Sequence, residues 1–149
     1  IKGKNWDSTY SNLDKFQEVG KKEFEKPVLT KTIPTEGNVI GNIDDFEVKP
    51  EFIRLSGWSS FKEQDATNND IKIIFIGKGK NYLIATQKVK RQDVTKAFNN
   101  KYNYDDAGFA VKMKRKDLPK GNYKIGIIVI NLKSKIQSVL ITERVLNNN

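Results

Sequence analysis

The sequence predicts an all-β fold, an antiparallel two-sheet β-sandwich of about seven strands that follows a short helical or linker segment. Two observations support this prediction. From Val39 onward, apolar and polar residues alternate with period two, and turn-forming residues recur every ~8–12 positions. The 149 residues are also enough for one compact domain, since single domains commonly run to ~100–150 residues.

The first part of the chain has a different pattern. We interpret residues 1–38 as an N-terminal stem or linker and residues 39–146 as the sandwich domain. Ser11 and Asp14 form a capping pattern, which favours a short amphipathic helix from about Asn12. Gly20 and the mixed charge weaken that helix, so a partly ordered linker is an equal alternative.

The expected strands are short segments of alternating or continuous apolar residues between turn signals such as KGK, LPKGN and NLKSK. The alternation of residues 108–115 predicts Phe109, Val111 and Met113 on one face, and Ala110, Lys112 and Lys114 on the other. A short helix is expected over 94–98. In order, the strands are VIGNIDDFEV (39–48), FIRLSGWSSF (52–61), IKIIFIG (71–77), NYLIATQKVKR (81–91), GFAVKMKR (108–115), YKIGIIVI (123–130) and IQSVLITERVL (136–146).

The composition excludes several kinds of chemistry. The chain has no cysteine and no histidine, so disulfides, thiolate zinc sites and Ser-His or Cys-His catalysis are impossible within it. The longest apolar runs, IIFI and IGIIVI, are far shorter than the ~20 residues that a membrane-spanning helix needs, so no span is expected within the chain. The chain begins at Ile1 without a signal-peptide pattern, and we expect a fragment or a processed product.

The net charge of +9 favours anionic partners, which include nucleic acid, anionic lipid and acidic polysaccharide. Nucleic acid is the least expected of these, because no aromatic residues interrupt the basic strands KVKR and VKMKRK as stacking platforms. The basic residues fall into two groups: Lys78, Lys80, Lys88, Lys90 and Arg91, and then Lys112, Lys114, Arg115, Lys116, Lys120 and Lys124.

The stretch RQDVTKAFNNKYNYDDAGFAVKM (91–113) is interpreted as a structural corner between the two sheets rather than a ligand site. Asp93 is expected to cap the short helix, and Arg91 to bridge loop carbonyls or pair with Asp93 or a carboxylate of YDD. Gly108 fits a position that needs a positive φ or a close backbone approach. Trp58 is expected in the core between the sheets, with a sugar-stacking role as the less favoured alternative.

Two groups of residues are candidates for glycan binding. Tyr102, Asn103 and Tyr104 combine aromatic rings with an amide, as saccharide recognition requires, although the same residues are ordinary in loops. The second group is a basic stripe that would form if the strands carrying its lysines are neighbours, with a solvated sheet face as the equal alternative. The stripe lysines are Lys88, Lys90, Lys112 and Lys114.

Neither a catalytic centre nor a metal or cofactor site is expected. Asp44 and Asp45 are adjacent on a strand and should point to opposite faces, which prevents them from acting as a glycosidase pair. Oxygen ligands for calcium cluster between Asp65 and Asp70, including Asn68 and Asn69, but a solvated loop is the favoured interpretation. The chain is therefore expected not to be an enzyme.

The ordered elements LSGWSSF, IKIIFIG, RQDVTKAF, AGFAVKM and LPKGNYKIGIIV resemble a β-sandwich module of bacterial cell-envelope proteins. In such proteins the module commonly follows the membrane-spanning region of glycosyltransferases and other polysaccharide-assembly proteins. The resemblance covers about residues 41–146. It implies an extracytoplasmic, immunoglobulin-like accessory domain without catalytic residues, tethered by a membrane segment upstream of Ile1.

Three roles remain open for such a domain. It can contact an anionic or neutral cell-wall glycan or a partner domain of its parent protein, or it can serve as a structural spacer or oligomerisation module. A basic nucleic-acid-binding domain is the third and lowest-ranked role.

Overall fold

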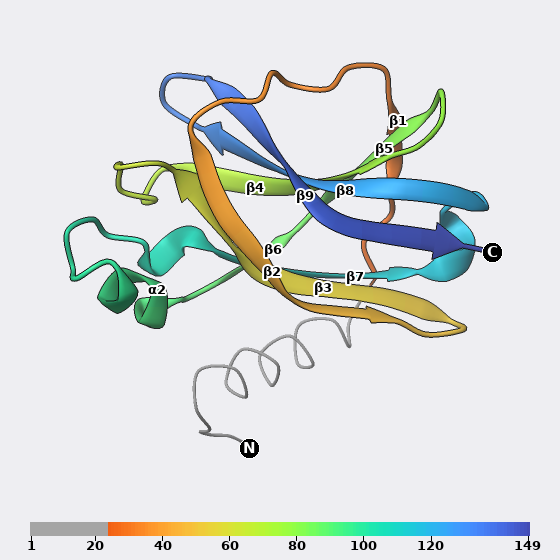
Figure 1. Ribbon diagram of the computed structural model, residues 1–149, viewed down its shortest axis with the longest axis horizontal. Helices are drawn as coiled ribbons and strands as arrows, with labels where there is room; N and C mark the ends of the chain where they lie inside the picture. Colours follow the sequence, from red (N-terminus) through yellow and green to blue (C-terminus); the bar gives the residue numbers. More distant parts are fainter. Residues whose placement is uncertain (1–23) are drawn as a thin grey trace.

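The computed structural model describes residues 24–149, which form two antiparallel sheets packed face to face (Figure 1). One sheet has five strands in the order β1-β5-β4-β8-β9, and the other has four in the order β2-β3-β7-β6. The all-β sandwich prediction is therefore confirmed. The elements are β1 (Val28–Thr30), β2 (Val39–Val48), β3 (Phe52–Phe61), β4 (Asn69–Ile76), β5 (Asn81–Ala85), β6 (Gln87–Val89), α2 (Gln92–Ala97), η1 (Asp105–Ala107), β7 (Gly108–Lys114), η2 (Arg115–Asp117), β8 (Gly121–Asn131) and β9 (Gln137–Asn148).

The largest difference from the predicted strands lies at residues 81–91. The expected single strand is two strands, because the chain leaves the five-stranded sheet after β5 and joins the four-stranded sheet as β6. Thr86 lies between them, and its Oγ1 donates a hydrogen bond to the carbonyl oxygen of Ile71 at 2.6 Å. This contact anchors the crossing point to β4.

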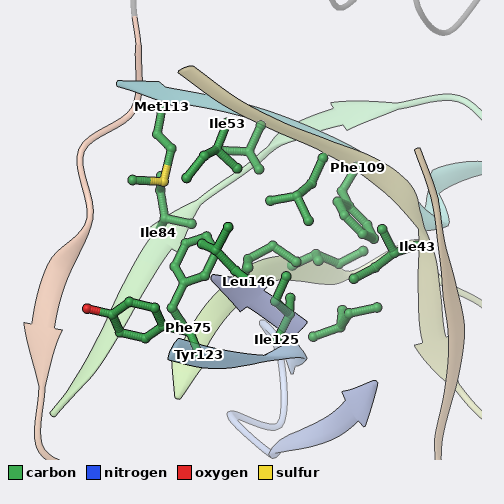
Figure 2. Close-up of a cluster of buried hydrophobic side chains, with 14 of the residues drawn as sticks. Ile43, Ile53, Phe75, Ile84, Phe109, Met113, Tyr123, Ile125 and Leu146 are labelled. Carbon is green, nitrogen blue, oxygen red and sulfur yellow. The ribbon is translucent and has the colours of Figure 1, made fainter. Parts of the chain in front are cut away.

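The main hydrophobic core fills the space between the inner faces of the sheets (Figure 2). In β7 the alternation follows the prediction, since Phe109, Val111 and Met113 belong to this core, whereas Ala110 is buried with Val89 in a separate cluster. From the opposite sheet, Phe75 and Ile125 are fully buried against the three core side chains of β7. Burial of large apolar side chains contributes about 1.5–3 kcal/mol each, so this layer is the main source of stability.

The connection from β1 to β2 runs along the outer side of the five-stranded sheet (Figure 1). It starts at the edge strand β1, which pairs with β5, and reaches the other edge, where the Val139 N–H donates to the Thr35 carbonyl oxygen at 3.1 Å. Glu36 also forms a parallel bridge with Val139. The five-stranded sheet thus includes residues 28–30, which precede the boundary at residue 39 expected for the sandwich domain. The short helix expected from about Asn12 lies outside the described residues.

The connections gather at two opposite ends of the sandwich. Helix α2 lies at one end, on the left in Figure 1, and the β4–β5 turn and the C-terminus lie at the other end.

Candidate functional site

Arg91 is the centre of an ion-pair network at the α2 end. Its Nε and Nη2 each donate to a different carboxylate oxygen of Asp93 at 2.8 Å, and its Nη1 donates to Asp44 Oδ2 at 2.7 Å. Burial opposes the charge of the guanidinium, but these hydrogen bonds outweigh it, so the pKa of Arg91 rises above its usual value. The backbone N–H of Arg91 donates to the Asp105 carbonyl oxygen at 2.7 Å. The contacts agree with a structural corner, with Asp44 as an unexpected partner.

The expected capping role of Asp93 is wrong. Helix α2 begins at Gln92, so Asp93 lies within its first turn, and the N-cap residue Arg91 makes no side-chain cap hydrogen bond. The carboxylate of Asp93 is held instead by Arg91, whose hydrogen bonds lower the pKa of Asp93 below its usual value.

Gly108 lies where two backbone segments approach closely. Its φ is −76°, so the alternative of a positive φ is excluded. A Cβ atom at this position would lie 2.1 Å from the carbonyl oxygen of Val89 and 2.5 Å from Cγ of Arg91. The close approach predicted for this glycine is therefore confirmed, and it brings Arg91 onto the sheet.

Trp58 and Tyr104 belong to a second hydrophobic cluster, outside the main core. Trp58 shares the outward face of β3 with Arg54 and Ser56, so the prediction that it packs between the sheets is wrong. Its ring meets Phe98 edge-on at 5.9 Å and lies 6.4 Å from the ring of Tyr104. Helix α2 and the segment after it cover this part of the four-stranded sheet, which explains a partly buried tryptophan on an outer face.

The expected saccharide loop is only partly available at the surface. Tyr104 is 1% exposed, and burial raises the pKa of its hydroxyl, so this ring is a core residue and not a stacking platform. Tyr102 is half-buried and packs against the same cluster. Asn103 is exposed, but its N–H donates to Asp65 Oδ1 at 2.7 Å and its Oδ1 accepts from the Asp105 N–H at 3.0 Å. These contacts serve the loop itself.

The predicted basic stripe does not form, although its two strands are neighbours. In the β6–β7 ladder Lys88 lies opposite Phe109, which faces the core, whereas Lys112 lies opposite Arg54 on the outer face. Lys88 Nζ donates to the Asn69 carbonyl oxygen at 2.9 Å. Lys90 Nζ pairs with Asp106 Oδ1 at 2.5 Å, which raises the pKa of Lys90. The pairing of β6 with β7 therefore places Lys88 on a different face of the sheet from Lys112, so the four lysines do not form one stripe.

Lys112 and Lys114 remain together on the outer face of β7. Lys112 Nζ lies 4.7 Å from the ring centroid of Phe52 and 5.0 Å from that of Phe24. Lys114 Nζ lies 5.7 Å from the same Phe24 ring. Cation–π contacts of this kind favour packing of the lysine stems along the sheet over free projection into solvent.

Asp44 and Asp45 lie on the same side, contrary to the prediction. The register of β2 against β3 shifts between Ile43 and Asp45, and the extra residue turns Asp44 toward Arg91 while Asp45 Oδ2 accepts from Ser56 Oγ at 3.1 Å. Both carboxylates line one depression, whose volume of about 20 Å³ is less than one sugar ring requires. Each carboxylate also has its own partner in the fold.

In the expected oxygen cluster, Asp65 and Asp70 accept backbone N–H groups, whereas the buried side-chain amide of Asn69 has no hydrogen-bond partner among the described residues. Asp65 accepts the Asn103 N–H, Asp70 Oδ1 accepts the Ile71 N–H at 3.0 Å, and Asn69 is 3% exposed. Within residues 24–149, no group of three or more acidic side chains is placed to hold a metal ion.

The opposite end of the sandwich carries a basic hollow that the sequence did not predict. The β4–β5 turn (77–80), Tyr82 and residues 119–123 enclose a volume of about 640 Å³. Lys78, Lys80 and Lys120 are exposed around it. Lys78 and Lys80 belong to the first basic group of the sequence and Lys120 to the second, and the fold brings the two groups together. We call this volume the first hollow.

The floor of the first hollow is held by aromatic contacts. The Tyr123 ring meets Tyr82 edge-on at 6.1 Å and Phe75 at 6.3 Å, and its hydroxyl donates to the Pro119 carbonyl oxygen at 2.7 Å. Burial raises the pKa of Tyr123, with a smaller effect from Tyr82, so this hydroxyl keeps its proton and remains a donor at neutral pH. Gly79 has a φ of +85°, which allows the tight turn that presents the two lysines.

The first hollow presents three cations and one partly exposed phenol ring around a space of ligand size. Ammonium groups attract carboxylate and phosphate oxygens, and an aromatic ring can contact the apolar face of a sugar.

Within residues 24–149, no helix has the length and the apolar composition needed to span a bilayer. Comparisons of the chain with protein-family models, curated proteins and solved structures found no match.

Proposed function

We propose that the chain is a non-catalytic, extracytoplasmic accessory module of a bacterial cell-envelope protein, and that it contacts an anionic glycan. The observation that carries the proposal is the first hollow, where Lys78, Lys80 and Lys120 converge beside Tyr82. A volume of about 640 Å³ lies within the ~300–1,000 Å³ that is usual for small-molecule sites. Tyr102, Tyr104, Lys88 and Lys90 take no part in it.

The charges favour a ligand with carboxylate or phosphate groups over a neutral glycan. Lys78, Lys80 and Lys120 form no ion pair with another described residue, in contrast to Lys90 and Arg91 at the other end. A lysine without an internal partner loses no existing contact when an anion binds. The attraction is electrostatic and should weaken with added salt.

The order of the strands supports the immunoglobulin-like part of the proposal. With β2, β3, β6 and β7 as strands A, B, D and E, the four-stranded sheet reads A-B-E-D. Strands β4, β8 and β9 then read C-F-G, as in immunoglobulin domains, with β5 beside β4 in the position of strand C′ and β1 as an additional edge strand. The envelope location rests on the resemblance of the motifs from LSGWSSF to LPKGNYKIGIIV.

An NMR titration tests the glycan contact. The labelled protein is titrated at low salt with a uronate disaccharide and with a neutral disaccharide of the same size. We expect saturable shifts at residues 77–82 and 119–123 with the uronate alone. The Lys78→Glu, Lys80→Glu double variant should lose them, because it reverses two of the three charges.

The β8–β9 turn offers a matched control. Lys133 and Lys135 are exposed, two residues apart in a turn, and lie in the connection at the α2 end, so Lys133→Glu with Lys135→Glu makes the same change in net charge. This variant should bind the uronate as the unaltered protein does. Equal losses in both double variants would reduce the contact to net charge and contradict the proposal.

A spacer or self-association role is the second candidate. It is favoured by apolar side chains that are more than half exposed at the edge strand β1 and the β8–β9 turn: Val28, Leu29, Leu132 and Ile136. Sedimentation velocity over a range of protein concentrations tests it. A concentration-dependent dimer without any shift on glycan addition would favour this candidate over glycan binding.

A further inference from the structure

A second hollow lies beside the first at the same end of the sandwich. It has a volume of about 570 Å³ and is lined by Pro50, Arg115, Lys116, residues 118–120 and the last two residues of the chain. Pro119 and Lys120 line both hollows. The two volumes are therefore neighbours that meet along a ridge formed by these two residues.

The ridge is pinned from both sides. The carbonyl oxygen of Pro119 accepts the Tyr123 hydroxyl at 2.7 Å from the first hollow and the Asn148 side-chain amide at 3.2 Å from the second. Asn148 is 3% exposed, and its amide also donates to the Leu118 carbonyl oxygen at 2.7 Å. Arg115 Nε in turn donates to Asn148 Oδ1 at 2.8 Å. The shape that separates the hollows is thus fixed by the fold before any ligand arrives.

The charged side chains that line the two hollows are all positive. Five cations line them, namely Lys78, Lys80, Arg115, Lys116 and Lys120, and none of their lining residues, all within the described part, is acidic. The four lysines are exposed, and none forms an ion pair with another residue of 24–149. Lys120 stands on the ridge, where it can attract an anion on either side.

We propose that the two hollows act as one track for a linear polyanionic glycan, with at least one anionic group held on each side of the Pro119–Lys120 ridge. This inference rests on the proposed function and names its ligand class, a polymer with regularly repeated charges. A chain that occupies both hollows binds the second as an intramolecular step, so its affinity exceeds that of a short fragment. A fragment that fills one hollow gains nothing from the other.

The lining chemistry favours a glycan over a single-stranded nucleic acid. Nucleic acids bind such grooves by stacking successive bases on aromatic rings. Tyr82 and Tyr123 are the aromatic lining residues of the first hollow, Tyr123 is 5% exposed, and the lining of the second hollow contains only aliphatic, amide and basic side chains. Repeated anions and hydroxyl groups suit these walls better than bases do.

A chain-length series of linear oligouronates tests the track. The probes are the mono-, di-, tetra- and octasaccharide, and the dissociation constant is measured by calorimetry at low and high salt. We expect affinity to rise at least about tenfold between the disaccharide and the octasaccharide, beyond the gain from repeated binding registers, because both hollows become occupied. The longer probe should also show the steeper salt dependence, since it engages more cations.

Two variants separate the hollows. Lys116→Glu should leave disaccharide binding in the first hollow nearly unchanged and remove most of the gain with length. Lys120→Glu should weaken short and long probes alike, because Lys120 lines both hollows. Both lysines are exposed, so the variants should unfold at the same temperature as the unaltered protein.

Other results of these measurements would overturn the track, the proposed function or the assignment to a glycan. The track would be overturned if the octasaccharide gains affinity only through the larger number of positions in which it can bind a single hollow. It would also be overturned if Lys116→Glu keeps the full gain in affinity with length. Either result would leave a glycan contact at one site. Failure of every oligouronate to bind would overturn the proposed function as well. Oligothymidylate of the same charge is the comparison for the octasaccharide. If it binds as tightly and responds in the same way to Lys116→Glu, the surface binds polyanions in general, and the assignment to a glycan is overturned.

Discussion

Replacement of Gly108 by alanine would force a methyl group into space that the backbone of β6 already fills. The new Cβ would lie 2.1 Å from the Val89 carbonyl oxygen and 2.5 Å from Cγ of Arg91. A backbone oxygen cannot rotate away as a side chain can. The strand β6 must therefore move away from β7, and Arg91 must move with it.

The loss in free energy of unfolding can be estimated from the contacts between β6 and β7 that this movement breaks. Strand β6 pairs with β7 through only three residue pairs, the last of which joins Val89 to Gly108. Overpacking in a tight site costs about 1–3 kcal/mol, and each backbone hydrogen bond lost adds about 1 kcal/mol. We expect Gly108→Ala to lower the free energy of unfolding by about 3–5 kcal/mol, a large part of the ~5–15 kcal/mol that domains usually have.

Urea unfolding followed by far-ultraviolet circular dichroism measures this loss. The control is Gly79→Ala, where no atom lies within 4 Å of the new Cβ and only the φ of +85° opposes the change. Its cost should be about 1–2 kcal/mol, from backbone strain alone. A Gly108→Ala variant within 1 kcal/mol of the control would refute the argument that the close approach of β6 constrains this position.

Three further predictions concern the ion pairs and the pinned ridge. Arg91→Met should lower the free energy of unfolding by about 2–4 kcal/mol in urea titrations, because Asp44 and Asp93 lose their shared cation while staying partly solvated. Because the folded state lowers the pKa of Asp93, the stability from its pairing is present above the usual value of 3.8 and is lost as the pH falls below it. Thermal melts of Arg91→Met should therefore show a weaker dependence on acid pH. Because burial raises the pKa of Tyr123, the stability that its neutral hydroxyl contributes is lost as the pH rises above the usual value of 10.0. Tyr123→Phe should therefore lose less stability at alkaline pH. At neutral pH it should lower the free energy of unfolding by about 1 kcal/mol, because the hydrogen bond to Pro119 is missing.

Local periodicity was a good guide to the strands and a poor guide to where they lie. The bounds of β2 and β3 match the predicted 39–48 and 52–61, because alternation along one sheet is a local property. The division at Thr86 could not be predicted, since a strand that changes sheets keeps the same alternation. Trp58 was misplaced although it has the same parity as Arg54 and Ser56, which already indicated the outer face.

The candidate site was harder to predict than the strands. Tyr104 lies in a non-repeating segment, where no period reveals burial, and an aromatic residue among Asn and Asp suggests a surface loop. The first hollow joins residues 77–82 to residues 119–123, and only the sheet topology brings these segments together. The two basic groups were visible in the sequence, but their meeting point was not.

The edges of both sheets bear on how copies of this module behave when they crowd along one polymer. In the five-stranded sheet, the edge strand β1 is three residues long, and the twelve-residue edge strand β9 is met by Glu36 at Val139. In the four-stranded sheet, β6 is equally short and β2 carries Asp44, Asp45 and Glu47, whose charges repel a second β2. On a surface that concentrates many copies, open edge strands would otherwise pair with the edge strands of neighbouring molecules. The short edges β1 and β6 and the acidic edge β2 should resist such pairing between neighbouring copies.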